Sequence, residues 1–474
     1  MQKNNLFIAV VLFLAGGVLS AQQQYSLREC VEMAVEKNIS IKQSQLDVQN
    51  AEIAKSDAFG NFLPNINASA SHSWNMGLNQ NITTGILENT TTQFTSMGGS
   101  LNVDVFKGFQ NVNQLYRANL NLLAQQYRLA DMTDDIMLFV ANAYLQVMFN
   151  RELVEVQKQQ IQITQTDLER TQVQIEAGVL VANEIYELEA NLATQQQELI
   201  RLENNLRLTK INLAQLLLIT DYENFNIAAE DFDVPFSEIL SKNPKEIFEK
   251  AMTFRNDIKL SETNIAIAEK DIAIAKGGLQ PSINAFYSYN TRISYSDRLI
   301  AGEGFTESPI GFVAETGQAV NTLRPNTKVV GPKSFQEQFG LNEGHNYGLR
   351  LSIPIFNQSA ARNQLKRSKV NLLRNENLLE QQKLDLETAV NQAYNDTRGA
   401  FTFYEAAQKT AYAREQAFRV AQNRYENGVL NTFDFVQAKQ RYDRALSDEV
   451  RAKYDYIFKL KVLEFYFGVP IAMD

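Results

Sequence analysis

Four stretches of the chain alternate strictly between apolar and polar side chains. In the first, after Pro64, Ile66, Ala68, Ala70, His72, Trp74 and Met76 alternate with Asn67, Ser69, Ser71, Ser73 and Asn75. A period of two is that of a β-strand with one apolar and one polar face. The alternation predicts strands over residues 65–76, 95–106, 282–292 and 346–356. Each is about ten residues long, the length that a tilted strand needs to cross a bilayer.

After the second and the fourth strand, the period becomes helical for a long stretch. Residues 113–176 contain no Pro or Gly, and they carry an apolar residue every seven positions: Val140, Val147, Val154, Ile161, Leu168 and Ile175. Residues 184–218 carry Leu188, Leu192, Leu199, Leu202, Leu206 and Leu213. These patterns predict coiled-coil helices over 113–176 and 184–218, and again over 360–426 and 432–467. A helix of about 65 residues would be about 100 Å long, so it must lie outside a membrane.

A shorter helix is expected just before the first strand, over residues 39–62. Placed end to end with the helix over 184–218, it would nearly equal the length of the long helix. We therefore expect two short helices stacked beside one long helix. Gly178 and Gly428 follow the long helices, where a left-handed C-terminal cap is favoured.

The chain is an internal duplication. Residues 100–115 resemble residues 350–365, and residues 174–180 resemble residues 424–430, both at an offset of 250 positions (350 − 100 and 424 − 174). We expect a first repeat over 22–220, a linker over 221–244 and a second repeat over 245–470. Four strands cannot close a barrel alone, and an open edge is not viable in lipid. Membrane insertion would therefore require several chains, and the alternative is a soluble sandwich sheet.

The first residues predict export from the cytoplasm. Lys3 precedes an apolar run from Leu6 to Leu19, and the small residues Ser20 and Ala21 follow. This is the order of a secretory signal peptide, expected over residues 1–21. The single cysteine, Cys30, can form no disulfide within the chain, and we expect it to be a small buried side chain.

Composition excludes several classes of function. The net charge of −9 argues against a nucleic-acid partner, and the mean hydropathy of −0.28 fits either a soluble protein or an outer-membrane barrel. The two histidines, His72 and His345, lie in or beside predicted strands, and the sequence holds no Cys/His cluster, phosphate-binding loop or dinucleotide fingerprint. We expect no enzyme activity, no cofactor and no metal site.

Local motifs resemble those of the TolC-like outer-membrane efflux family. The turn patterns that carry the resemblance are Ile175, Gly178 and Glu184 in the first repeat, and Tyr425, Gly428, Asp434 and Ala438 in the second. Further similar positions are Ser26-Leu27, Ala34, Asn38, Leu63-Pro64, Gln280-Pro281 and Gly468-Val469-Pro470. Leu218 departs from the pattern, because the family has a glycine at the end of that helix.

The resemblance implies a mainly α-helical chain with a membrane β-barrel portion. Three chains would form a homotrimer with one barrel of twelve strands in outer-membrane lipid, and a tunnel of twelve helices extending into the periplasm. Such a protein would be the exit duct of a tripartite efflux or type I secretion system, with a periplasmic adaptor and an inner-membrane transporter as partners. The cargo stays open: drug, metal ion, peptide or protein. A periplasmic coiled-coil adaptor and a barrel-anchored hydrolase are the alternatives.

Two sets of site residues follow. The hairpin turns, Gly178, Val179 and Leu180 together with Gly428, Val429 and Leu430, are the expected adaptor contact, although these residues could simply hold the turns. The channel-gate candidates are Asp434, Gln437 and Glu184. For Glu184 and Asp434 the alternative is capping of a helix start. The loops over 77–93 and 292–344 are expected to be polar and to face the cell exterior.

Overall fold

The computed structural model describes residues 24–80, 85–228 and 238–469, so the expected signal peptide, residues 1–21, lies outside the described residues. The chain divides into two compact units. Unit 1 comprises Met1–Glu52, Leu120–Ala266 and Leu372–Asp474, and unit 2 comprises Ile53–Asn119 and Ile267–Asn371. Each unit thus takes segments from both sequence repeats, because helices of both repeats run from one unit into the other.

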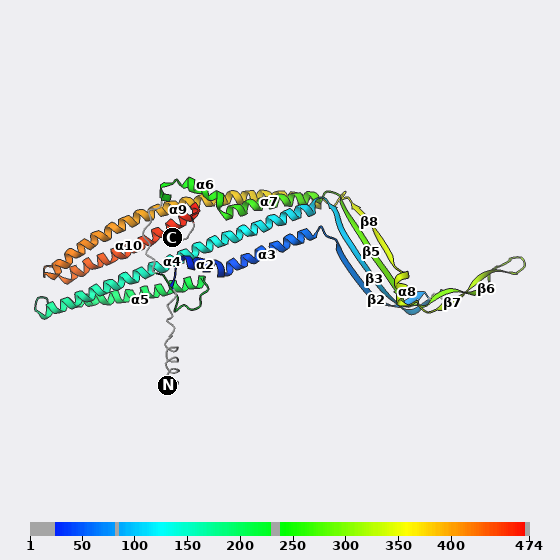
Figure 1. Cartoon of the computed structure of the whole chain (residues 1–474), viewed down its shortest axis with the longest axis horizontal. Helices are drawn as coiled ribbons and strands as arrows, with labels where there is room; N and C mark the ends of the chain where they lie inside the picture. Colours follow the sequence, from blue (N-terminus) through cyan, green and yellow to red (C-terminus); the bar gives the residue numbers. More distant parts are fainter. Residues whose placement is uncertain (1–23, 81–84, 229–237, 470–474) are drawn as a thin grey trace, which may run out of the picture. The chain divides into compact units, whose positions relative to one another are not determined.

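Four helices match the coiled-coil pattern closely. They are α4 (Gln110–Glu176), α5 (Glu184–Leu216), α9 (Ala360–Glu426) and α10 (Thr432–Phe467). α4 and α9 have 67 residues each, which reflects the duplication. In unit 1, α4 with α5 and α9 with α10 form two helical hairpins, shown in cyan-green and orange-red in Figure 1. No helix among the described residues is both long and apolar enough to cross a membrane.

Shorter helices complete the α-helical part of the chain. These are α2 (Leu27–Lys37), α3 (Ile39–Gly60), α6 (Pro244–Phe254), α7 (Asn256–Gly277) and α8 (Phe335–Leu341). α3 falls where the sequence predicts a helix over 39–62, and α7, also of 22 residues, is its equivalent in the second repeat. In the linker, β4 (Asn226–Ile227) pairs in parallel with β1 (Gln24–Tyr25), and a 3₁₀ turn covers Glu238–Ser241. Residues 229–237 of the linker lie outside the described residues.

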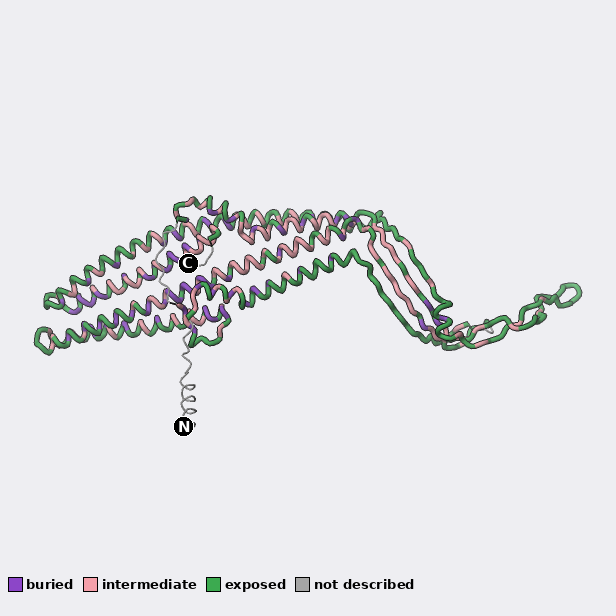
Figure 2. Tube along the Cα trace, viewed as in Figure 1, coloured by how far each residue is buried: buried purple, intermediate pink, exposed green. Residues whose placement is uncertain are grey.

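The heptad positions form the core of unit 1. Val140, Val147 and Val154 on α4 are buried, and so are Leu188, Leu202 and Leu213 on α5. Except for Leu188, they pack with α2, where Cys30 is fully buried, as expected for a small core side chain. A second apolar cluster joins α6, α9 and α10. Figure 2 shows buried residues recurring at intervals along these helices, as expected when one side of a helix is apolar and packed and the other side is exposed.

Unit 2 contains a four-stranded antiparallel sheet in the order β2-β3-β5-β8. Its strands are β2 (Asn65–Gln80), β3 (Leu87–Lys107), β5 (Ser282–Ser294) and β8 (Gly344–Ser352). β2 and β3 extend through most of the expected loop over 77–93, because the strand pairing continues as far as Gln80 and Leu87. β8 ends at Ser352, so Ile353 and Ile355, which share the alternating pattern, lie beyond the strand.

The pairing register gathers the apolar positions on one face of this sheet. Ile66 pairs with Leu101, Leu101 with Tyr287, and Tyr287 with Tyr347. Residues directly opposite each other in an antiparallel sheet point to the same face. On the other face, Asn67, Ser100, Ser288 and Asn346 form a corresponding polar row. The two-faced sheet that the sequence predicts is thus formed.

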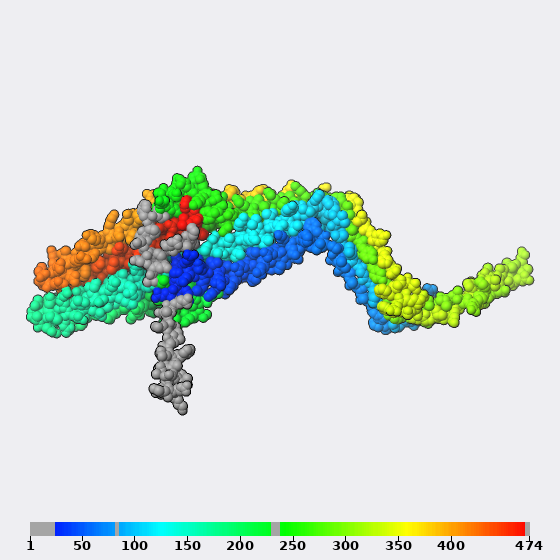
Figure 3. Space-filling view, viewed as in Figure 1, coloured from blue at the N-terminus to red at the C-terminus, as the bar shows by residue number. Residues whose placement is uncertain are grey.

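The expected polar loop over 292–344 is largely structured, which corrects the sequence prediction. It contains β6 (Arg298–Phe312) and β7 (Ala319–Val330), which pair as an antiparallel ribbon, followed by α8. The ribbon carries exposed large apolar residues, among them Phe305, Phe312 and Leu323. On the face that Figure 3 shows, no other segment covers the ribbon. Its alternation is interrupted by two register shifts, which hid the strands from a simple period-two search.

All four sheet strands meet the helices at the same end of unit 2. Ser282 of β5 pairs with Lys107 at the end of β3 and with Ser352 at the end of β8. At this end a Cβ atom on Gly277 would lie 2.5 Å from the carbonyl oxygen of Gly108. Glycine is therefore required there so that the two helix–strand junctions can approach each other.

Candidate functional site at the hairpin turns

The two hairpin turns of unit 1 have the same backbone structure. Gly178 and Gly428 adopt φ angles of +76° and +70°, the left-handed region that the sequence predicts for them. The N–H groups of Val179 and Val429 donate to the carbonyl oxygens of Gln174 and Arg424, both at 2.9 Å. This is the Schellman pattern, which satisfies carbonyl groups at the end of a helix.

Within each turn the valine and the leucine have different surroundings. Val179 and Val429 are 63% and 75% exposed. Leu180 and Leu430 are partly buried against an apolar cluster that contains Leu188, Phe418, Tyr425, Phe435 and Val436. The leucines therefore stabilise the turns, and the valines remain available for a partner.

Asp434 lies in the first turn of α10 and contacts the residue that caps this helix. The N-cap residue of α10 is Asn431, whose Oδ1 accepts a hydrogen bond from the Asp434 N–H at 2.8 Å, and its Nδ2 donates to Asp434 Oδ2 at 3.0 Å. A carboxylate in the first turn also interacts favourably with the helix dipole. Asp434 is nonetheless exposed, and so is Gln437, which accepts a hydrogen bond from Arg441 at 2.9 Å.

Glu184 caps a helix other than its own. Its Oε2 accepts a hydrogen bond from the backbone N–H of Thr432 at 3.1 Å, so the first residue of α5 holds the start of α10. The two residues are 248 positions apart, and nothing in the sequence pattern pairs them. The N-cap of α5 itself, Asn183, makes no side-chain capping hydrogen bond.

Other contacts tie the two hairpins together near their turns. Arg170 of α4 forms an ion pair with Glu426 of α9. The Thr171 hydroxyl lies 2.8 Å from the Tyr425 hydroxyl, which also accepts a hydrogen bond from the Thr432 hydroxyl at 3.2 Å. Apart from Tyr425, which belongs to the turn pattern, sequence reasoning did not single out these residues, because polar side chains in a heptad pattern usually face solvent.

A buried polar cluster lies deeper between the same helices. Lys439 of α10 is 1% exposed and carries Asp167 and Asp443 as its charged neighbours. Asp443 Oδ2 accepts a hydrogen bond from Gln195 of α5 at 3.1 Å. Burial raises the pKa of Asp443 and of Asp167 to about 6, against the attraction of Lys439. Burial also lowers the pKa of Lys439. We refer to Asp167, Gln195, Lys439 and Asp443 as the buried polar cluster.

The comparison with solved structures gives the fold. The chain superimposes on the outer membrane protein VceC of Vibrio cholerae with a TM-score of 0.72 over 94% of this chain and 97% of VceC, at 13% identity. The Campylobacter jejuni CmeC outer membrane channel gives a TM-score of 0.69 over 94% of this chain and 87% of CmeC, at 16% identity. The fold is therefore that of the TolC-like channels.

Sequence comparison gives the family. The chain is 25% identical over 338 residues to the pyoverdine export outer membrane protein OpmQ of Pseudomonas aeruginosa, a match that covers 70% of this chain and 60% of OpmQ. The OpmQ protein of Pseudomonas putida is 25% identical over 199 residues, 41% of each chain. The matched stretches thus span less than two thirds of these relatives. The profile of the outer membrane efflux protein family matches residues 30–217 and 248–469, and the chain belongs to this family.

Proposed function

We propose that this chain is the outer-membrane exit duct of a tripartite efflux or type I secretion system and conducts exported solutes passively. The supporting observation is the sheet of unit 2, which exposes an apolar face and, within the described part of the chain, leaves the outer edges of β2 and β8 unpaired. Lipid would cover the apolar face, and further copies would pair the edges. Three copies of four strands would give the closed barrel of twelve strands, in a homotrimer whose helices form a tunnel of twelve helices.

The periplasmic adaptor is the second class of function, and two measurements separate it from the duct. The full-length chain should fractionate with the outer membrane as a heat-modifiable oligomer, because barrels resist detergent until they are heated. Purified protein should also conduct ions in a planar bilayer. A chain that remains in the soluble periplasmic fraction and gives no conductance would be an adaptor.

We propose the exposed valines of the turns as the contact for a periplasmic adaptor, which links the duct to an inner-membrane transporter. Val179→Asp combined with Val429→Asp would place charges where an apolar contact is needed. The double variant should abolish export by the assembled system while trimer formation and outer-membrane location stay unchanged. Export would be followed as resistance to, or secretion of, the pump's own cargo.

A matched variant controls for the added charge. Ala182→Asp with Asn427→Asp introduces two carboxylates at exposed positions close to the same turns and keeps both valines. This control should export normally. Full export in the Val179/Val429 variant, or equal loss in the control, would show that the valines are not the contact.

The gate proposal rests on Asp434 and Gln437, which are exposed on one face of α10 next to the turn. Threefold symmetry would bring three copies of each residue into one ring at the periplasmic end of the tunnel. Glu184 would act in this gate by positioning α10 through its hydrogen bond to Thr432.

A further inference from the structure

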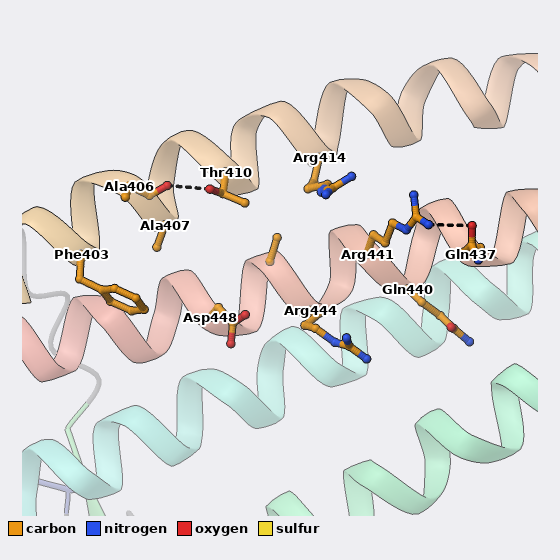
Figure 4. Close-up of a pocket in the computed structure, with 11 residues that line it drawn as sticks. Phe403, Ala406, Ala407, Thr410, Arg414, Gln437, Gln440, Arg441, Arg444 and Asp448 are labelled. Atoms are coloured by element: carbon orange, nitrogen blue, oxygen red, sulfur yellow. Dashed lines mark hydrogen bonds between the residues drawn. The ribbon is translucent and has the colours of Figure 1, made fainter.

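A groove of about 510 Å³ lies between α9 and α10 in unit 1. Arg414 of α9 and Arg441 and Arg444 of α10 line it, and Figure 4 labels all three side chains. Small residues on the facing helices, such as Ala407 and Ala445, leave the space open. We refer to this feature as the arginine groove.

The positive charge of the arginine groove is not neutralised within the chain. Among the residues that the structure describes, Arg441 donates to the neutral Gln437, and neither Arg414 nor Arg444 forms a hydrogen bond or an ion pair. Asp448 is the one carboxylate that lines the groove, so the lining carries three positive charges and one negative charge.

Three other acidic side chains of the same hairpin have partners elsewhere. Glu415 pairs with Arg419, Asp434 with Asn431, and Asp443 with Gln195. The groove is therefore a basic site on a chain whose net charge is −9. A concave site with several unpaired guanidinium groups suits an anionic ligand, because arginine binds carboxylate and phosphate groups through paired hydrogen bonds.

The groove lies on the same face of α10 as the gate candidates. Asp434, Gln437, Arg441, Arg444 and Asp448 follow one another at spacings of three and four residues and are all exposed. Residues with these spacings share one side of a helix. At about 1.5 Å per residue, Arg441 and Arg444 lie about 10 Å and 15 Å along the helix from Asp434.

We propose that the arginine groove binds anionic solutes that carry two or more carboxylate or phosphate groups, and that it selects such solutes as cargo. This proposal rests on the proposed function. If the face of α10 that carries Asp434 lines the tunnel, the groove on the same face also opens into the tunnel. Three copies would present three grooves at one level, as rings of arginine or lysine do in anion-conducting pores. Conduction requires that a bound solute be released again, and an open groove leaves a path for that release.

The test measures binding separately from conduction. Citrate, a tricarboxylate, is titrated into the detergent-solubilised full-length protein in a calorimeter at low ionic strength. Arg441→Gln combined with Arg444→Gln should weaken citrate binding by about tenfold or more, as expected for the loss of charge-assisted hydrogen bonds. Lys409→Gln with Arg424→Gln removes the same charge from exposed positions of α9 outside the groove, and should leave the affinity within about twofold of the wild type.

Three results would overturn the proposal. The wild type could fail to bind citrate, for instance because a neighbouring chain's carboxylates fill the groove. The arginine variant could bind citrate as tightly as the wild type, or the control could lose as much affinity as the arginine variant. Conductance of the same preparations in planar bilayers decides the proposed function independently. If the protein binds citrate through Arg441 and Arg444 but does not conduct, the duct function is wrong and the binding site stands. If the protein conducts but its citrate affinity is unchanged by the substitutions, the binding site is wrong and the duct function stands.

Discussion

Besides Glu184, which accepts from the Thr432 N–H, two side chains act at the start of α10. Asn431 accepts the hydrogen bond of the Asp434 N–H, which is an uncharged capping contact. Asp434 adds a negative charge at the exposed side of the first turn. Separate substitutions can therefore remove the cap at Asn431 and the charge at Asp434. Comparing them distinguishes a structural role of Asp434 from a role in the gate.

Asp434→Asn keeps the shape of the side chain and removes the charge. In planar bilayers we expect this variant to lower cation selectivity and to weaken block by multivalent cations added on the periplasmic side, because acidic rings favour cations. Helix stability should fall by only about 0.3–1 kcal/mol. The measurement is the reversal potential in a salt gradient, together with the blocking concentration.

Asn431→Ala provides the comparison. It removes the cap, at a cost of about 1 kcal/mol, and leaves the charge of Asp434 in place. Selectivity should then stay near the wild-type value. An Asp434→Asn trimer with unchanged selectivity and block would show that Asp434 only supports the start of α10 and has no role in the gate.

At the scale of helices and hairpins, the buried polar cluster makes the contact between the hairpins depend on pH. Asp443 has a pKa raised by burial, so its protonated form is favoured in the folded state. The stability that it contributes is present below its unfolded pKa, near 3.8, and is lost as the pH rises through about 6. Burying a charged carboxylate beside Lys439 thus costs stability at neutral pH.

Asp443→Asn should raise the melting temperature Tm of the solubilised protein at pH 7.5. The gain corresponds to up to about 3 kcal/mol, from a pKa shift of about two units at 1.36 kcal/mol each. It should shrink as the pH falls through 6 and vanish near pH 4, where wild-type Asp443 is protonated. Asp448→Asn, a change at an exposed carboxylate of the same helix, should show no such gain. A lower Tm for Asp443→Asn at pH 7.5 would mean that the attraction to Lys439 outweighs the burial.

The long helices could be predicted from sequence almost to the residue, and the contacts between them could not. The heptad repeat and the turn glycines determine α4, α5, α9 and α10, because both signals are local. The strands β6 and β7 escape a period-two search because their pairing shifts register twice, and α7 is a helix for which the second repeat gives no prediction. The hydrogen bond from Thr432 to Glu184 and the Asp443–Gln195 contact join residues 248 positions apart, which no local pattern reveals.

For the whole molecule, the strand register determines which strand ends lie at the same end of the sheet. The start of β5 pairs with the end of β3 and with the end of β8, so the helix connections of unit 2 leave from one end of the sheet. The β2–β3 connection and the segment that holds β6, β7 and α8 lie at the other end. If the sheet spans the outer membrane with its helices in the periplasm, the β6–β7 ribbon faces the cell exterior.

Cysteine labelling in intact cells tests this orientation. Ser308 lies in β6, and the only native cysteine, Cys30, is fully buried, so an engineered Ser308→Cys would be the accessible thiol. A membrane-impermeant maleimide should label it in intact cells, because the ribbon would stand outside the membrane. Ala182→Cys, near the α4–α5 turn, should react only after the outer membrane is disrupted, because that turn would lie in the periplasm. Labelling of Ser308→Cys that also requires disruption would place the ribbon in the periplasm and reverse the proposed orientation.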